Sequence, residues 1–136
     1  MARVRYLADT SVLLDFFGRR VKPQSDLLER ALRAREVVGI SGQILQEALQ
    51  GSRGSASFEA MRGRLVRLPL FEPGDVYNSR VMAATTYARL RWHGITVHSA
   101  GDCLIALTAI EHELTLLHDD ADFEKIAAVE PRLKLA

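Results

Sequence analysis

The sequence predicts an α/β protein, a three-layer α/β/α sandwich built around a mainly parallel sheet. Short strand-like segments alternate with helix-length segments, which is the order expected of right-handed βαβ crossovers. The strand-like segments VVGI and LTLL are apolar throughout, as in sheets that are covered on both faces. Neither an internal repeat nor a Pro/Ser-rich linker divides the 136 residues, so we expect residues 1–136 to form a single domain.

The first third of the chain alternates clearly between the two patterns. Continuous apolar or β-branched residues predict strands, and apolar residues three and four positions apart predict helices. A glycine ends the first of these helices. A serine begins the last of them and a second glycine ends it. The predicted elements are a strand at residues 4–8, a helix at residues 10–17 ended by Gly18, a helix at residues 25–35, a strand at residues 36–40, and a helix that Ser41 caps and Gly51 ends.

The rest of the chain continues the alternation. Its longest predicted element is a helix opened by Pro73 and Asp75, which runs to Gly94. The other predicted elements are a helix at residues 58–64, a strand or extended segment at residues 65–71, a strand at residues 95–97, a helix at residues 99–113, a strand at residues 115–117, a helix at residues 122–129 and a final strand at residues 133–135.

Charge and composition exclude several function classes. The chain carries 18 basic and 17 acidic residues, so it has no uniformly basic surface, and basic residues that contact a polyanion must be segregated from the acids. A single cysteine, Cys103, cannot form an internal disulfide. The N-terminus lacks an apolar run of signal-peptide length, and no run approaches the roughly 18 residues that span a bilayer. We therefore expect a cytoplasmic protein without a membrane role.

Acidic residues follow two of the predicted strands. In parallel α/β sheets, ligands bind at the carboxyl ends of the strands. Asp9 follows the first strand, and Asp119 and Asp120 follow the last clear one. Asp9 also precedes a helix directly, so it could instead be an N-cap that accepts the N–H groups of Ser11 or Val12.

Two further acids lie on predicted helices. Glu47 lies at the edge of the apolar face of its helix, about 60° around from Ile44, where a solvated glutamate is the simpler alternative. Asp102 follows Ser99 by three residues, which is the spacing of a capping box. Asp102 also opens the segment CLIALTAI, which is apolar almost all round, so we expect this carboxylate near the sheet rather than in open water.

The acids after the last clear strand divide into different roles. Asp122 precedes Phe123 and Ile126, which share a helical face, so we predict that Asp122 is the N-cap of that helix. Asp119 and Asp120 have no such local role, and we expect Asp120 to be the one that points inward.

Together these acids can converge at one edge of a parallel sheet. Such a cluster suits a hard divalent cation: Mg²⁺ binds oxygen ligands at about 2.0–2.1 Å and keeps several waters, so carboxylates from separate elements suffice. Two such ions roughly 3.5–4 Å apart can activate a water and stabilise a leaving oxygen in phosphodiester cleavage. The pattern therefore predicts a metal site with hydrolytic potential.

Several stretches of the chain carry a resemblance to a known family. They are LADTSVLLDFF, ILQEALQG and SAGDCLIALTAIEHELTLLHDDADF, in that order and spacing. With them the chain resembles PIN-domain ribonucleases of the VapC type, the toxins of bacterial toxin–antitoxin pairs, over nearly its whole length. The resemblance implies a small PIN-like α/β/α domain with Mg²⁺/Mn²⁺-dependent endoribonuclease activity, as the toxin component of a type II system.

The resemblance also implies residue roles and partners. The implied metal-binding and catalytic acids are Asp9, Glu47, Asp102 and Asp120, with Asp122 as an auxiliary metal-binding acid and Ser11 positioning metal-bound water. In the implied mechanism a bound water attacks the phosphorus and the 3′-side ribose hydroxyl departs. Relatives are commonly homodimers whose sites face a shared groove, and an antitoxin inserts there, often with a basic residue against the acids. His118 stands where many members have Thr.

Other site types have less support. The run Glu111-His112-Glu113 contains the first two residues of an HExxH zinc site, but position 116 is Leu instead of the required His. Cys103 begins an apolar run in which it is expected to pack. A receiver-like phosphoacceptor domain should carry an acid pair after its first strand, where Asp9 stands alone. A catalytically inactive PIN-like module that binds RNA or protein is a further alternative.

Arginines form two clusters that could contact RNA. Arg62, Arg64 and Arg67 form one, and Arg89 and Arg91 beside Trp92 form the other. Arginine beside an aromatic ring suits phosphate contacts and base stacking. A solvated helix face is the alternative for each of them.

Overall fold

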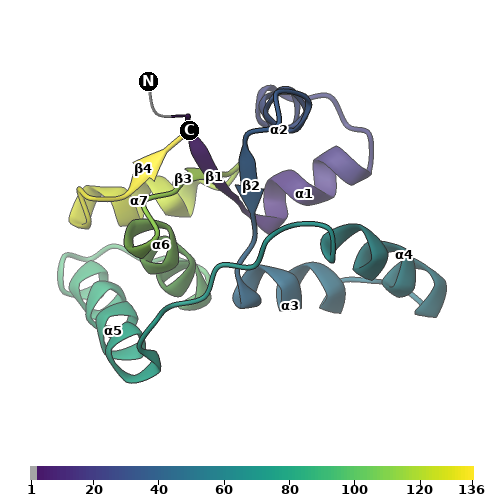
Figure 1. Ribbon diagram of the computed structural model, residues 1–136. Helices are drawn as coiled ribbons and strands as arrows, with labels where there is room; N and C mark the ends of the chain where they lie inside the picture. Colours follow the sequence, from purple (N-terminus) through teal and green to yellow (C-terminus); the bar gives the residue numbers. More distant parts are fainter. Residues whose placement is uncertain (1–2) are drawn as a thin grey trace.

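Seven helices and four strands make up residues 3–136, the part of the chain that the computed structural model describes (Figure 1). The strands are β1 (Arg5–Ala8), β2 (Val37–Gly39), β3 (Thr115–Leu117) and β4 (Lys134–Leu135). The helices are α1 (Thr10–Phe17), α2 (Pro23–Arg33), α3 (Gly42–Gln50), α4 (Ser55–Leu65), α5 (Val76–Trp92), α6 (Gly101–Glu111) and α7 (Ala121–Val129). Ser41 and Asp75 cap α3 and α5, as predicted.

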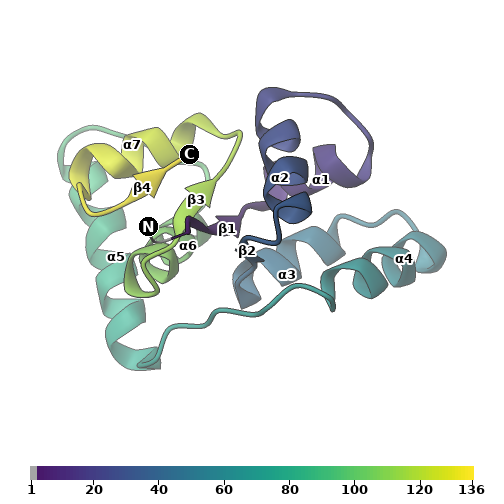
Figure 2. The ribbon, with the colours of Figure 1, turned by 45° about the horizontal axis from the view of Figure 1, so that its top comes forward.

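The four strands form one parallel sheet in the order β2-β1-β3-β4. In this sheet Leu7 of β1 lies between Gly39 of β2 and Leu116 of β3. The path from β1 to β2 runs in one direction along the sheet, and the two later crossovers run in the other. Right-handed crossovers then place helices on both faces, which the two ribbon views bear out (Figures 1 and 2). The predicted α/β/α architecture is confirmed.

Helix α6 forms the centre of the helical layer next to the acids. It is buried without interruption from Asp102 to Ala109, and it packs against α5, α7 and β3. This confirms the prediction that Asp102 opens a buried helix. Neither α6 nor any other helix within residues 3–136 has the length and apolar character needed to cross a membrane.

Two segments form no strand in the described residues: residues 65–71, predicted as a strand or an extended segment, and residues 95–97, predicted as a strand. Helix α4 continues to Leu65, and within residues 65–71 only Leu70 pairs, in an isolated bridge with Ile40. Residues 95–97 form no strand either, because the N–H of Ile95 closes the end of α5 by donating to the carbonyl of Leu90. Val97 is buried, so its β-branched side chain serves packing rather than strand pairing.

Candidate metal centre

The fold brings the sequence-predicted acids to the carboxyl edge of the sheet. Asp9 directly follows β1, and its N–H donates to the carbonyl of Leu117 at the end of β3 over 2.9 Å. Glu47 lies on α3, Asp102 in the first turn of α6, and Asp120 at the start of α7. Four separate elements therefore each supply one carboxylate to the same edge.

Asp9 satisfies both interpretations that the sequence left open. It is the N-cap of α1, and its Oδ2 accepts hydrogen bonds from the N–H of Ser11 (3.1 Å) and from the Ser11 hydroxyl (2.6 Å). It is also only 5% exposed and faces Asp120. Burial raises the pKa of Asp9 even though the bonds from Ser11 lower it. The cap therefore fixes the carboxylate inside the acidic cluster, which consists of Asp9, Glu47, Asp102, Asp120 and Asp122.

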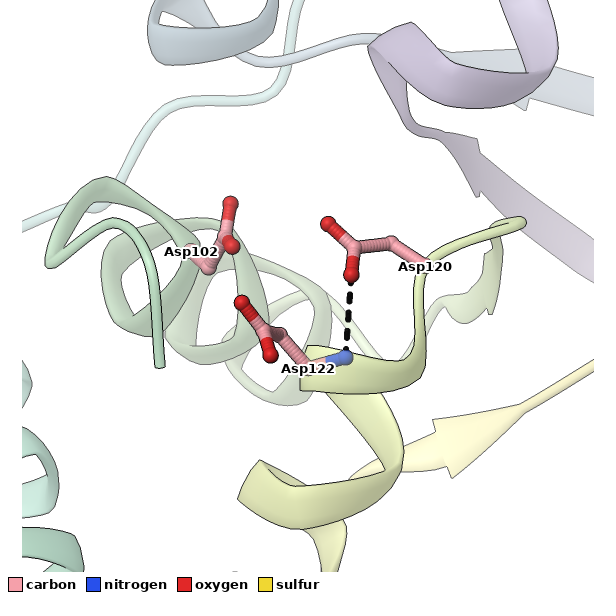
Figure 3. A group of neighbouring side chains, drawn as sticks. All are labelled: Asp102, Asp120 and Asp122. Carbon is pink, nitrogen blue, oxygen red and sulfur yellow. Dashed lines mark hydrogen bonds between the residues drawn. The ribbon is translucent and has the colours of Figure 1, made fainter. Parts of the chain in front are cut away.

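Three of the acids form the tightest group. Asp102, Asp120 and Asp122 each offer one oxygen, and these oxygens lie within 4.8 Å of one another (Figure 3). No ion pair links Asp102 to a basic residue within residues 3–136. Burial is the largest cause that raises the pKa of Asp102 to about 7, and repulsion from Asp9 and Asp120 adds to it. The three carboxylates are therefore placed so that they could hold a metal ion.

The structure corrects one cap prediction and rules out the capping-box alternative for Asp102. Asp120, not Asp122, is the N-cap of α7: its Oδ1 accepts the N–H of Asp122 over 2.9 Å. Ser99 and Asp102 do not form a capping box, because α6 begins one residue later than that box requires and the Ser99 hydroxyl accepts the N–H of Gly101 instead. The Asp102 side chain therefore does not cap α6, and one carboxylate oxygen of Asp120 points toward Asp102 (Figure 3).

Asp122 is held differently from the other acids. Its Oδ2 accepts from the N–H and from Nδ1 of His98, each at 2.8 Å, and Lys125 Nζ lies 3.3 Å from its Oδ1. Burial works to raise the pKa of Asp122, but the bonds from His98 and Lys125 outweigh it and leave the pKa lowered. Asp122 therefore ties α7 to the segment that leads into α6.

His98 is a residue that the sequence analysis did not single out. Its ring contacts Asp122, which lies 24 residues later in the chain, so no local sequence pattern predicts this contact. Lys125, in contrast, lies three residues after Asp122, at the spacing at which helical side chains meet, and this ion pair could have been predicted.

Glu47 stands at the side of the cluster. It is half-buried, and its Oε1 accepts a hydrogen bond from Gln43 Nε2 over 3.2 Å. Burial raises the pKa of Glu47, and the nearby Asp9 adds to the shift. Glu47 is therefore electrostatically coupled to the cluster rather than a solvated helix glutamate.

The loop that carries Asp120 is fixed by neighbours on both sides. The N–H of Asp119 donates to the Ser11 hydroxyl over 3.0 Å, and Lys22 Nζ lies 3.4 Å from the exposed Asp119 carboxylate. Asp119 therefore points outward, as expected. His118 is buried, and its Nδ1 lies 3.0 Å from the Asp120 carbonyl. The side chain of His118 therefore supports the loop by contacting the backbone of Asp120.

The donor set fits a hard divalent cation. All the acids at this edge offer carboxylate oxygens, and in the tightest group neither sulfur nor imidazole is a ligand. Such sites suit Mg²⁺, Ca²⁺ or Mn²⁺ rather than zinc or copper. Burial, and after it the neighbouring acids, raise the pKa of Asp102, and a cation bound there would lower that pKa again.

Comparisons with known proteins show the family of the chain. The family model described as PIN domain matches residues 6–129. The chain belongs to the PIN-domain family. It is 34% identical to the VapC ribonuclease Mb1587 of Mycobacterium bovis and to ribonuclease VapC11 of Mycobacterium tuberculosis, over 90% of this chain and 92% of each relative.

Solved structures share the PIN fold with this chain. VapBC2 from Rickettsia felis, bound to a DNA fragment from its promoter, matches with a TM-score of 0.71 and 20% identity over 98% of both chains. VapBC-1 from nontypeable Haemophilus influenzae matches with a TM-score of 0.73 and 19% identity over 98% of this chain and 97% of that chain. At these identities the likeness concerns the fold.

Proposed function

We propose that this protein is a divalent-metal-dependent endoribonuclease and the toxin of a type II toxin–antitoxin pair. The acids that hold the metal in this proposal are Asp9, Glu47, Asp102 and Asp120, with Mg²⁺ as the ion and Mn²⁺ as a substitute. The observation that carries it is Asp102, which is 7% exposed and faces only other acids, so that its pKa rises to about 7. The mycobacterial relatives named as VapC ribonucleases support the reaction class.

The residues of the chain prepare the site in distinct ways. A divalent ion bound there would activate the attacking water and stabilise the leaving 3′-oxygen. Ser11 orients Asp9 through its hydroxyl and also holds the N–H of Asp119, so it connects the two strand ends. We assign Ser11 to this support, with the positioning of water as its further predicted role. Asp122 holds the entry to α6 and can share its Oδ1 with a metal.

The proposal extends to partners and assembly. Solved structures with this fold include VapBC complexes, two of them bound to DNA, which supports a cognate antitoxin as a partner of this chain. RNA is the substrate that the named ribonuclease relatives support. We also propose a homodimer, a single PIN domain over residues 1–136 and a cytoplasmic location. The receiver-like alternative loses support, because the PIN model covers residues 6–129.

Cleavage of total RNA tests the proposal. The purified protein is incubated with total RNA in Mg²⁺ or Mn²⁺, beside Asp102→Asn and Asp15→Asn prepared in the same way. Asp15 is as little exposed as Asp102 but is ion-paired away from the site, so Asp15→Asn controls for the substitution itself, whereas Asp102→Asn from the same preparation controls for contamination. We expect discrete cleavage by the wild type and Asp15→Asn, and at least a roughly 100-fold loss in Asp102→Asn and in chelator.

Equal cleavage by all three proteins would reveal a contaminating nuclease. Binding of RNA without cleavage by the wild type, in either metal, would favour the catalytically inactive PIN-like module instead. Both outcomes would overturn the assignment of Asp102.

A further inference from the structure

A groove lies beside the acidic cluster, between α3, α5 and α6. Its volume is about 410 Å³, which is within the range of small-ligand sites, roughly 300–1,000 Å³. The residues that define it are Gln43, Arg80, Ala84, Tyr87, Gly101 and Leu104.

The groove and the acidic cluster share a wall. Gln43 lines the groove, and its Nε2 also donates to Glu47 Oε1 over 3.2 Å. Gly101 lines the groove one residue before Asp102. A Cβ at position 101 would lie 2.6 Å from Gln43 Nε2, so the glycine lets Gln43 lie against the first turn of α6. A ligand in this groove therefore lies next to the carboxylates.

Arg80 gives the groove an uncompensated positive charge. It is exposed and forms no ion pair with any other residue between positions 3 and 136. Arg89, on the same helix, is occupied instead: its NH1 lies 3.1 Å from Glu130 Oε1 and its NH2 donates to the carbonyl of Val129. A free guanidinium next to an acidic site is suited to a phosphate that approaches that site.

The rest of the groove is lined by an aromatic ring and apolar side chains. Tyr87 is half-buried and packs against the core, so its ring is held in place. Ala84 and Leu104 are the small and apolar neighbours. Such a surface suits a nucleobase, because proteins bind single-stranded RNA by stacking its bases on aromatic side chains while cationic side chains contact its phosphates.

We propose that this groove binds one nucleotide of single-stranded RNA next to the phosphate to be cleaved, with Arg80 on a backbone phosphate and Tyr87 against the base. The proposal rests on the ribonuclease function above and adds the residues that seat the substrate. Arg80 and Tyr87 are substrate-binding residues here, and the acids remain the groups at the reacting atoms.

Binding to RNA that cannot be cleaved tests the groove. Arg80→Ala, Tyr87→Leu and Tyr87→Phe are made in the Asp102→Asn background, and a short fluorescein-labelled single-stranded RNA of mixed sequence is titrated in Mg²⁺ by anisotropy. Arg33→Ala is the charge control. Arg33 is the last residue of α2 and precedes the amino end of β2, so it lies at the edge of the sheet opposite the acids. Thermal melting of every variant checks the fold.

We expect Arg80→Ala and Tyr87→Leu to weaken binding roughly ten-fold each, and Tyr87→Phe, which keeps the ring, to restore most of it. Arg80→Ala should also reduce the salt dependence of binding by about one phosphate contact. In the cleaving enzyme the same changes should raise KM more than they lower kcat, as for a lost ground-state contact.

Several results would overturn the proposal. One is unchanged RNA binding in Arg80→Ala and Tyr87→Leu. Another is a loss equal to that of Arg33→Ala. A third is a change of oligomeric state in place of RNA affinity, which would make the groove a contact between copies of the chain. If the wild type does not cleave RNA but Arg80→Ala still weakens binding, the nuclease function fails while the groove stands.

Discussion

Asp15 and Asp102 are two aspartates with the same 7% exposure but opposite electrostatic surroundings. Asp15, on α1, is covered by basic side chains: Arg20 Nε lies 2.7 Å from its Oδ1, and Lys22 Nζ lies 3.1 Å from its Oδ2. The bond from Arg20, followed by that from Lys22, lowers the pKa of Asp15. Asp102 is covered by the fold itself, and burial and neighbouring acids raise its pKa to about 7.

This difference separates a structural acid from one prepared for a ligand. A carboxylate that is paired with basic side chains of the same chain stabilises the fold without any ligand. A buried carboxylate surrounded by other carboxylates destabilises the free protein and gains from a cation supplied from outside. A buried carboxylate alone therefore does not indicate a cation site, whereas a buried carboxylate that lacks a basic partner does.

Metal binding should separate the two aspartates most strongly. At a Mg²⁺ or Mn²⁺ concentration of about 100 times Kd, the wild type should gain about 2.7 kcal/mol, or roughly 10 °C in melting temperature. Asp15→Asn should gain as much, and Asp102→Asn should gain little. Mn²⁺ should act at lower concentration than Mg²⁺. Differential scanning fluorimetry across a metal titration measures this, and a flat wild-type response would contradict the site.

The metal-free protein should lose stability as the pH rises through neutrality. The pKa of Asp102 is about 7 in the folded state against 3.8 for the free group, so its contribution is fully present below 3.8 and is lost as the pH passes about 7. In chelator, unfolding by urea should show a fall on the order of 2 kcal/mol between about pH 5.5 and pH 8. Asp102→Asn should show a clearly smaller fall. An equal fall in both proteins would place the effect elsewhere.

The sequence predicted the elements better than the contacts between them. The bounds of α1 and β3 are as predicted because their apolar patterns and end signals are local. The N-cap of α7 was assigned to Asp122, since both Asp120 and Asp122 are good caps and only the chain path decides between them. The contact of His98 with Asp122 and the raised pKa of Asp102 depend on residues distant in sequence, which no local pattern reveals.

The RNA-binding expectation for the arginines shows the same limit. Arg89 was grouped with Arg91 and Trp92 from their spacing, but Glu130 and Val129 occupy its guanidinium. Arg80 was not singled out, although it lines the groove next to the acids. Spacing finds clusters of charge, whereas only the fold shows which charges remain free.

Asp15→Asn should destabilise the fold modestly without affecting the site. The lowered pKa of Asp15 means that its ion pairs contribute above the free value of 3.8 and lose that contribution as the pH falls through the lowered folded value. We expect a melting temperature lower by a few degrees at neutral pH, because Arg20 and Lys22 are largely exposed. The difference from the wild type should shrink in acid. Melting curves at acidic and neutral pH test this, and a loss of RNA cleavage would contradict the separation of the two regions.

Lys22→Met gives the smallest expected effect and tests how the two regions are joined. Lys22 Nζ contacts Asp15 and, at 3.4 Å, the Asp119 carboxylate in the loop that carries Asp120. Met keeps the length of the side chain but not its charge. Asp15 keeps Arg20, and the Asp119 N–H keeps the Ser11 hydroxyl, so the loop loses one exposed contact of two. We therefore expect metal affinity to fall about two- to three-fold, with Lys22→Arg restoring it. Isothermal titration with Mn²⁺ measures this change. A loss as large as that of Asp102→Asn would mean that the basic cluster is part of the metal centre, and the contrast between Asp15 and Asp102 would then no longer separate structure from function.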